Sequence, residues 1–180
     1  DVMGCDEGGD KGGDGDVKGV YDTLAVIENL SELSVDFPTQ LVSQSNILKW
    51  ILKRIGSVSS VLDTNKLYCS EILAILLQNS DSNRLKFGEL GGVLPLLTNI
   101  APYKRRDPEN LEEEEWIENL FDCLSSMMMC RENKERFIHA EGVELMLLVL
   151  KGRRFAARSA LKLLAFVLDR YAQGFFFIFF

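Results

Sequence analysis

Apolar side chains recur at helical spacing along most of the chain from Val17 onward. Val20, Leu24, Ile27 and Leu30 form one such set, and residues at this spacing share one face of a helix with 3.6 residues per turn. No long segment alternates apolar and polar residues with period two, which is the pattern of a half-buried strand. The pattern therefore predicts an all-α protein.

Short polar or glycine-containing breaks separate the predicted helices. Examples are Phe37-Pro38-Thr39, Asn79-Ser80-Asp81, Gly91-Gly92 and Arg106-Asp107-Pro108, and residues of these types end one helix and start the next. Four glutamates, Glu112 to Glu115, follow the last of these breaks. They favour a helix start, because carboxylates there meet the positive end of the helix dipole.

Two blocks fifty residues apart share one pattern. Asn83 to Phe87 precedes Gly91 to Leu97, and Asn133 to Phe137 precedes Glu141 to Leu147, with asparagine, basic, aromatic, glycine and valine residues in register. Each block predicts a short helix, a sharp turn and a second helix, and a longer helix precedes each block. Three short helices with apolar faces cannot bury those faces alone, so neighbouring units must stack.

The chain divides into three parts on composition. Residues 1–16 are rich in glycine and aspartate, and they bury too little apolar surface to offset the entropy of ordering, so we expect disorder there. Residues 17–172 form the predicted repeat domain. Residues 173–180 are an apolar tail to which the sequence assigns no role.

The repeated pattern resembles the armadillo repeat: asparagine, a basic residue and an aromatic residue, then Gly-Gly-Val and two leucines, then a long helix. The resemblance implies an armadillo-type right-handed α-solenoid of about three to four helical repeats. Within that group, several segments resemble the beta-catenin-like protein 1 family, and the chain reads as a fragment or short form of it. These segments are 22–30, 48–54, 65–78, 118–122, 133–137 and 158–162.

What this resemblance implies about function is specific. Members of the family are nuclear armadillo proteins of the spliceosome, associated through the nineteen complex, and they bind basic nuclear-localisation-type segments of partner proteins. We therefore expect a non-enzymatic protein-binding scaffold in a pre-mRNA splicing assembly, located in the nucleus.

Little in the sequence supports catalysis. The only histidine is His139, and the pair Cys123 and Cys130 has no further paired cysteines to complete a zinc site. No phosphate-binding loop ending in Gly-Lys-Ser or Gly-Lys-Thr is present. We expect no catalytic residue, no metal and no cofactor.

The balance of charged residues indicates which classes of partner the chain can be expected to bind. Lys and Arg number 20 against 27 Asp and Glu, for a net charge of −7, and a nucleic-acid binder carries the opposite sign. No interior run of 18 apolar residues is present to span a bilayer. The expected chain is soluble and intracellular, with protein partners, no direct nucleic-acid contact and no membrane contact. The oligomeric state stays open.

In an armadillo protein the third helices of successive repeats line a groove for an extended peptide. Asn29 and Gln78 resemble the amides that hold a peptide backbone, since an amide both donates and accepts, whereas Met128 interrupts that series. Carboxylates beside them suit Lys or Arg of a basic peptide. A solvated or helix-capping role stays open for each. The further groove candidates are Tyr68, Glu71, Glu118, Asn119 and Asp122.

A basic patch near the C-terminal end supports a second hypothesis, contact with RNA phosphates or an acidic partner. Charge at loops and helix ends explains it equally. A cytoplasmic armadillo or HEAT adaptor is the other alternative. The basic patch comprises Lys104, Arg105, Arg106, Lys151, Arg153, Arg154 and Arg158.

The two tryptophans, Trp50 and Trp116, fall on apolar stripes of their helices and are predicted to be core residues.

Overall fold

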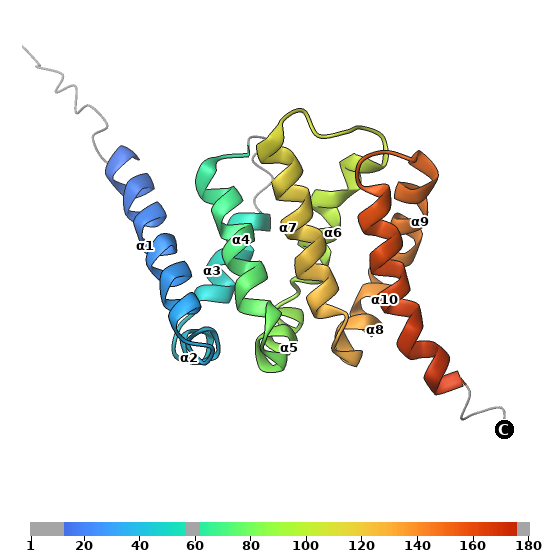
Figure 1. The fold of residues 1–180 in the computed structure, drawn as a ribbon, viewed down its shortest axis with the longest axis horizontal. Coiled ribbons are helices and arrows are strands. Elements are labelled where there is room, and N and C mark those ends of the chain that lie inside the picture. The colour runs from blue at the N-terminus through green and yellow to red at the C-terminus, as the bar shows by residue number, and fades with distance from the viewer. Residues whose placement is uncertain (1–12, 57–61, 176–180) are drawn as a thin grey trace, which may run out of the picture.

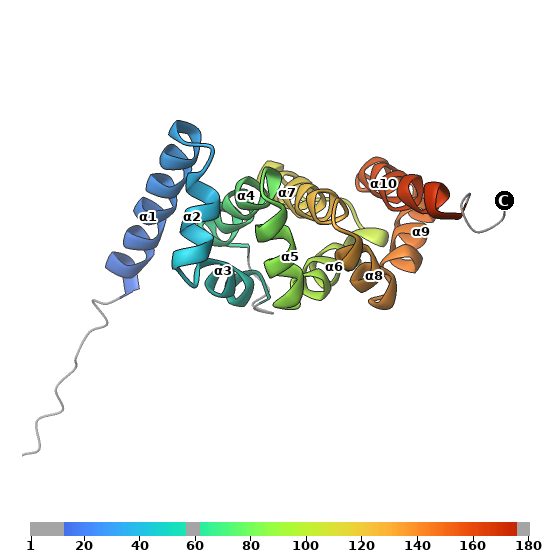
Figure 2. The ribbon, with the colours of Figure 1, turned by 90° about the horizontal axis from the view of Figure 1, so that it is seen from below.

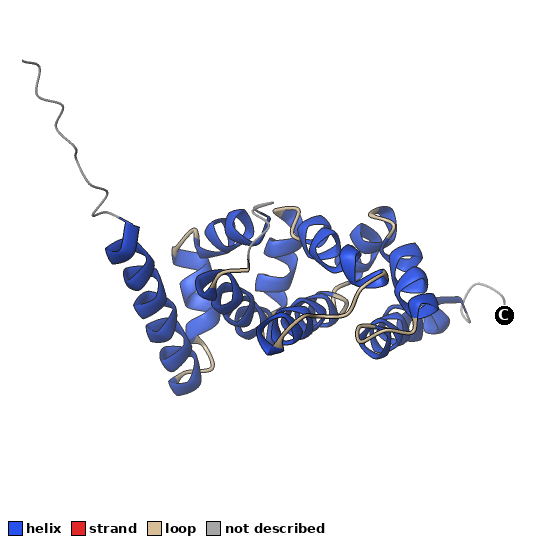
Figure 3. Ribbon diagram, turned by 90° about the horizontal axis from the view of Figure 1, so that it is seen from above, coloured by secondary structure: helices blue, strands red, loops and turns tan. Residues whose placement is uncertain are grey.

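The computed structural model describes the backbone of residues 13–56 and 62–175, and the side chains of 17–56 and 62–168. This part of the chain consists of helices joined by turns and loops, with no strand (Figure 3), so the predicted all-α class is confirmed. The elements are α1 (Gly13–Leu33), α2 (Phe37–Gln44), α3 (Ile47–Gly56), α4 (Thr64–Gln78), α5 (Asp81–Glu89), α6 (Val93–Ile100), the 3-10 helix η1 (Ala101–Lys104), α7 (Leu111–Met127), α8 (Arg131–His139), α9 (Gly142–Gly152) and α10 (Ala157–Phe175).

The helices group into three repeats of three. The first repeat is α2–α4, the middle repeat is α5–α7 and the last repeat is α8–α10, while α1 takes the place of a third helix before them. In Figures 1 and 2, α1, α4, α7 and α10 form one layer. The helices α3, α6 and α9 form a second layer that packs against one face of the first. Contacts of α4 with α1 and α7, and of α7 with α10, run along the first layer. The predicted armadillo-type solenoid is confirmed.

In the middle and last repeats, the glycine at the turn between the first two helices faces the aromatic ring of the same repeat. A Cβ atom added to Gly92 would lie 2.2 Å from a carbon of the Phe87 ring, and one added to Gly142 would lie 2.5 Å from the Phe137 ring. Both rings are fully buried. The first and second helices of a repeat therefore approach too closely for any side chain at the glycine position.

The residue before that glycine is left-handed in both repeats. Gly91 has φ +83° and Glu141 has φ +57°. Glycine adopts this conformation without cost, whereas a residue with a Cβ is disfavoured there. The turn between the first and second helices thus has the same left-handed backbone geometry in both repeats, although only the middle repeat has a glycine, Gly91, at this position.

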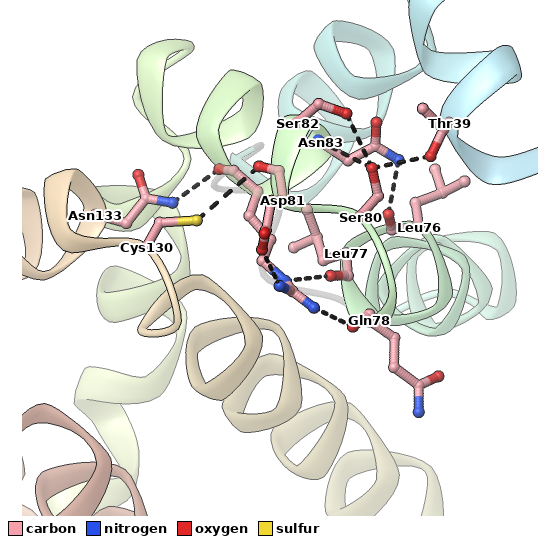
Figure 4. Close-up of polar contacts among 11 residues, drawn as sticks. Thr39, Leu76, Leu77, Gln78, Ser80, Asp81, Ser82, Asn83, Cys130 and Asn133 are labelled. Atoms are coloured by element: carbon pink, nitrogen blue, oxygen red, sulfur yellow. Dashed lines mark hydrogen bonds and ion pairs between the residues drawn. The ribbon is translucent and has the colours of Figure 1, made fainter. Parts of the chain in front are cut away.

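In the middle and last repeats, a buried asparagine connects neighbouring helices (Figure 4). Asn83 Nδ2 donates to the carbonyl oxygen of Leu76 (2.8 Å), and Asn133 Nδ2 donates to that of Arg84 (2.8 Å). Asn83 Nδ2 also donates to the carbonyl oxygen of Pro38 (3.2 Å). Both asparagines are buried. Since a buried side-chain amide is costly without hydrogen-bond partners, these bonds favour one register between successive repeats.

Two details differ from the sequence expectations. Helix α1 begins at Gly13, within the segment expected to be disordered, because extending an existing helix costs far less than starting one. Residues 1–12 and 176–180 lie outside the described residues. Trp116 is buried, but Trp50 is 38% exposed and lies beside an apolar hollow between α1 and α3, so the prediction of a core Trp50 was wrong.

Candidate peptide-binding site

A pocket of about 240 Å³ lies on the layer formed by α1, α4 and α7. These three helices come from different repeat units, so the pocket exists only because the units stack. We call it the acidic pocket. Its lining residues are Tyr21 and Glu28 of α1, Thr64, Leu67, Tyr68 and Glu71 of α4, and Glu115 of α7.

Three carboxylates, one from each helix, give the acidic pocket its charge. Glu71 is half-buried, and burial raises its pKa above the usual range, with the nearby charges of Glu28 and Glu115 adding to the effect. Within the part of the chain that the structure describes, no Lys or Arg forms an ion pair with any of the three. The like charges therefore repel one another, and a cation entering the pocket would relieve that repulsion.

Two tyrosines form the apolar part of the acidic pocket. The ring centroids of Tyr21 and Tyr68 lie 5.1 Å apart at an interplanar angle of 50°. The Tyr68 hydroxyl donates a short hydrogen bond to Glu28, and burial together with this bond raises the pKa of the Tyr68 phenol. Tyr68 therefore stays protonated and orients the Glu28 carboxylate.

The chemistry of the acidic pocket favours an organic cation. Carboxylates attract ammonium and guanidinium groups, and aromatic faces attract the same cations and pack on their methylene stems. In the described ranges no three His, Cys, Asp or Glu side chains converge closely enough to hold a metal ion. The pocket suits a Lys or Arg side chain better than a bare ion.

The acidic character continues along α7. Glu115, Glu118 and Asp122 are spaced by three and four residues, so they follow one side of the helix, and all three are exposed. Of the residues predicted from the sequence, Tyr68 and Glu71 line the acidic pocket, while Glu118 and Asp122 extend from it along α7.

The predicted amides lie outside the pocket lining. Asn29 is exposed, and its Nδ2 donates to the carbonyl oxygen of Ala25 in the same helix (2.8 Å). Gln78 is exposed at the last position of α4. Asn119 is half-buried and donates to Ser70 Oγ (3.1 Å), which connects α7 to α4. The peptide-holding role of these amides stays a prediction.

Sequence reasoning missed Tyr21, Glu28 and Glu115. Tyr21 and Glu28 are seven residues apart and share a face of α1, a spacing that could have identified them. Glu115 belongs to the run interpreted only as a helix start. Its part in the pocket depends on how α7 packs against α4, which the sequence does not give.

The cysteines of the helical layer are packing residues. Cys69 and Cys123 are fully buried, and burial raises the pKa of the Cys69 thiol to about 12 and that of Cys123 higher still. A buried thiol that stays protonated is a poor nucleophile. His139 is exposed on α8.

The members of the predicted basic patch differ in their contacts, since some form ion pairs and others do not. Arg106 pairs with Glu113 and Glu109, and Arg154 pairs with Asp107. Arg158 is exposed in the first turn of α10. Lys104 is half-buried, and Arg105, Lys151 and Arg153 are exposed.

The stacked three-helix repeats define the class of the molecule: an armadillo-type helical-repeat protein with an acidic pocket on its third-helix layer. Comparison with known proteins then gives the family. Residues 6–175 match the family model described as "Catenin-beta-like, Arm-motif containing nuclear", and the chain belongs to this family.

Curated relatives support the same assignment. The chain is 46% identical over 146 residues to beta-catenin-like protein 1 of Homo sapiens and of Rattus norvegicus. These matches cover 81% of the chain and 26% of each relative. It is 36% identical over 159 residues to the Schizosaccharomyces pombe homolog, covering 88% of the chain and 28% of the relative. The chain thus spans about a quarter of the length of these relatives. Across the described helices, none is long and apolar enough to cross a bilayer.

Proposed function

We propose that this chain is a non-enzymatic scaffold whose acidic pocket binds a Lys or Arg side chain of an extended basic segment in a partner protein. The observation that carries the proposal is the set of three carboxylates, Glu28, Glu71 and Glu115, gathered from three helices without an ion-pair partner among the described residues. Repelling charges of this kind do not stabilise the free protein, so their gathering favours a binding role.

The binding mode follows from the geometry of the layer. A basic side chain packs against the paired Tyr21 and Tyr68 rings and meets the carboxylates, and the next basic residues of the segment meet Glu118 and Asp122 along α7. Charge-assisted hydrogen bonds in such a setting are about twice as strong as neutral ones. Phosphate groups are repelled by the same surface, which disfavours RNA on this face.

The cellular setting is part of the proposal. The family description contains the word nuclear, and the relatives are named beta-catenin-like protein 1. Together with the resemblance noted in the sequence, these names support a nuclear splicing assembly whose factors carry basic nuclear-localisation-type segments. The acidic pocket provides the complementary charge for such segments.

Titration calorimetry with a Lys- and Arg-rich nuclear-localisation-type peptide tests the proposal. Saturable binding to the full chain is expected, and Glu71→Gln with Glu115→Gln should weaken it by about tenfold or more. The matched control is Glu132→Gln with Glu144→Gln, two exposed carboxylates on α8 and α9, outside the layer that forms the pocket. Equal affinity for both double variants would overturn the assignment of the pocket.

A second pair of substitutions tests the amides separately. If Asn29 and Gln78 hold the peptide backbone, Asn29→Ala with Gln78→Ala weakens binding of the same peptide while helicity by circular dichroism is unchanged. If affinity stays at the level of the unmodified chain, backbone recognition by these amides is ruled out, and the side-chain pocket alone accounts for binding.

A further inference from the structure

Two basic segments that are distant in sequence meet at the edge where α6 and α9 end. Lys104 closes η1 and Arg105 follows it, while Lys151 and Arg153 flank the end of α9. A Cβ atom added to Gly152 would lie 2.7 Å from the Lys104 carbonyl oxygen, so the two backbones touch. Figure 1 shows the same proximity of the segment after α6 and the end of α9.

Neighbouring arginines fix these two segments in place. Arg154 pairs with Asp107 at 2.8 Å, and the backbone N–H of Phe155 donates to the same carboxylate at 2.9 Å. Both bonds lower the pKa of Asp107. On the other side, Arg106 pairs with Glu113 and its guanidinium lies 4.5 Å from the centre of the Tyr103 ring. The charges of Arg106 and Arg154 are thus used to hold the edge together.

The other four basic side chains of this edge form no ion pair with any residue that the structure describes. Lys104 is half-buried, and Arg105, Lys151 and Arg153 are exposed. Considering only residues that the structure describes, no carboxylate lies within 4.0 Å of their charged groups. We call Lys104, Arg105, Lys151 and Arg153 the basic edge. Four unpaired cations at one place are unexpected in a chain of net charge −7.

A structural explanation accounts for part of this arrangement. Lys151 and Arg153 stand at the C-terminal end of α9, where the helix dipole favours a positive charge. However, Arg153 has φ +52°, a left-handed position that glycine usually occupies after a helix. The dipole also does not require that the basic end of η1 lie against the basic end of α9. Repulsion between the two ends opposes that contact, unless an anion lies between them.

We propose that the basic edge binds a short acidic segment of a partner protein, in addition to the function proposed for the acidic pocket. The edge carries four charges and is confined to η1 and the end of α9, which suits a few carboxylates in sequence. Phe155, which is 38% exposed, provides an apolar contact next to the charges. The partner segment is therefore a run of Asp or Glu that includes an apolar residue.

Nucleic acid fits this edge less well. A long polyanion leaving the basic edge toward α7 would meet Glu112 and Glu114 in the first turn of that helix. Tyr103 is only 4% exposed and is covered by Arg106, so its ring cannot stack on a base. An acidic peptide makes its contacts without leaving the edge.

Fluorescence anisotropy with the full chain tests this proposal. The probe is a fluorescein-labelled peptide of alternating Glu and Gly with one central Leu, and its comparators are the same peptide with Gln for Glu and a single-stranded oligouridine. The test variant is Arg105→Gln with Lys151→Gln and Arg153→Gly, the last chosen because glycine keeps the left-handed turn. The control is Lys18→Gln with Lys49→Gln and Lys53→Gln, which removes the same charge from exposed sites on α1 and α3.

The proposal expects the Glu peptide to bind, the Gln peptide to fail, and affinity to fall as salt rises. The test variant should lose about tenfold in affinity and the control less than about twofold. Tighter binding of oligouridine that the test variant also loses would overturn the acidic-segment assignment in favour of nucleic acid. Equal affinity of test and control variants, or no binding of any probe, would overturn the site itself.

Discussion

The middle and last repeats share one buried framework but differ in the charge they present. Each has the buried asparagine and the aromatic ring packed on a glycine. Yet α7 begins with glutamates at positions 112–114, whereas α10 has no acidic residue in its first turn and carries Arg158 there. Buried positions therefore fix how the repeats stack, while exposed positions are free to give each repeat its own partner chemistry.

The strongest way to break the shared framework is to fill the glycine position. Gly92→Ala forces the Phe87 ring out of a filled core, and we expect a loss of about 3 kcal/mol in the free energy of unfolding, with a similar loss for Gly142→Ala. Urea denaturation followed by circular dichroism measures it. Gly19→Ala, where nothing lies within 4 Å, is the control and should be neutral or stabilising. A cost below about 1 kcal/mol at both buried glycines would show that the ring contact is unimportant.

The junction asparagines come next. Asn133→Ala removes the hydrogen bond from the buried Asn133 amide to the Arg84 carbonyl oxygen and leaves a small cavity, and we expect a loss of about 2 kcal/mol. The same denaturation experiment applies, with the exposed Asn29→Ala as the matched substitution, for which the expected change is within about 0.5 kcal/mol. If both substitutions cost the same, the asparagine does not hold the repeats in register.

Glu113, in the first turn of α7, makes the stability of the middle repeat depend on pH. Glu113 accepts hydrogen bonds from Arg106 (3.0 Å) and Tyr103 (2.7 Å) and from the backbone of Glu109 (2.6 Å). The Arg106 bonds, followed by those of Tyr103 and Glu109, lower the Glu113 pKa to about 2. The ionised carboxylate therefore stabilises the fold above its unfolded pKa of about 4.3, and that contribution is lost as the pH falls toward about 2.

Glu113→Gln is expected to cost about 1–2 kcal/mol at neutral pH, a figure reduced because Arg106 is partly exposed. The variant and the unmodified chain should converge in stability as the pH falls to about 2. Thermal unfolding between pH 2 and pH 7 checks this. A difference in stability that stays constant over the whole range would contradict the assigned ionisation.

The smallest effect concerns the turn residue that differs between the two repeats. Glu141→Gly removes the left-handed strain of a residue with a Cβ, which stabilises the fold. Because glycine also increases the entropy of the unfolded chain, which offsets part of this gain, we expect a net stabilisation of only about 0.5 kcal/mol. Gly91→Ala should destabilise the middle repeat by about 1 kcal/mol. Destabilisation by Glu141→Gly would mean that the Glu141 side chain has a role that outweighs the strain.

The buried framework of the middle and last repeats was predictable because the residues that pack their helices together occur twice in the sequence, fifty residues apart. Asn83 and Phe87 recur as Asn133 and Phe137, and their burial explains why the residue types are kept. The acidic pocket was only partly predictable. Tyr68 and Glu71 were identified through a resemblance, but their neighbours on α1 and α7 lie outside the repeated pattern.

Trp50 shows the same limit from the packing side. Its place on an apolar stripe predicts burial, but burial also requires a neighbouring helix to cover the stripe. On α3 the described residues leave an apolar hollow of about 580 Å³ beside it. Periodicity thus identifies the apolar face of a helix and does not show what packs on that face.

The central claim is that the acidic pocket binds basic side chains, and a charge-exchange cycle tests it most directly. Calorimetry would compare the unmodified chain and Glu71→Lys, each with the basic peptide and with peptides in which one Lys is replaced by Glu. We expect each single change to weaken binding, and the Glu71→Lys chain to recover affinity for one particular exchanged peptide, with a coupling energy of about 1–2 kcal/mol. Coupling within about 0.5 kcal/mol of zero for every exchanged position, in a variant that stays folded, would contradict the claim.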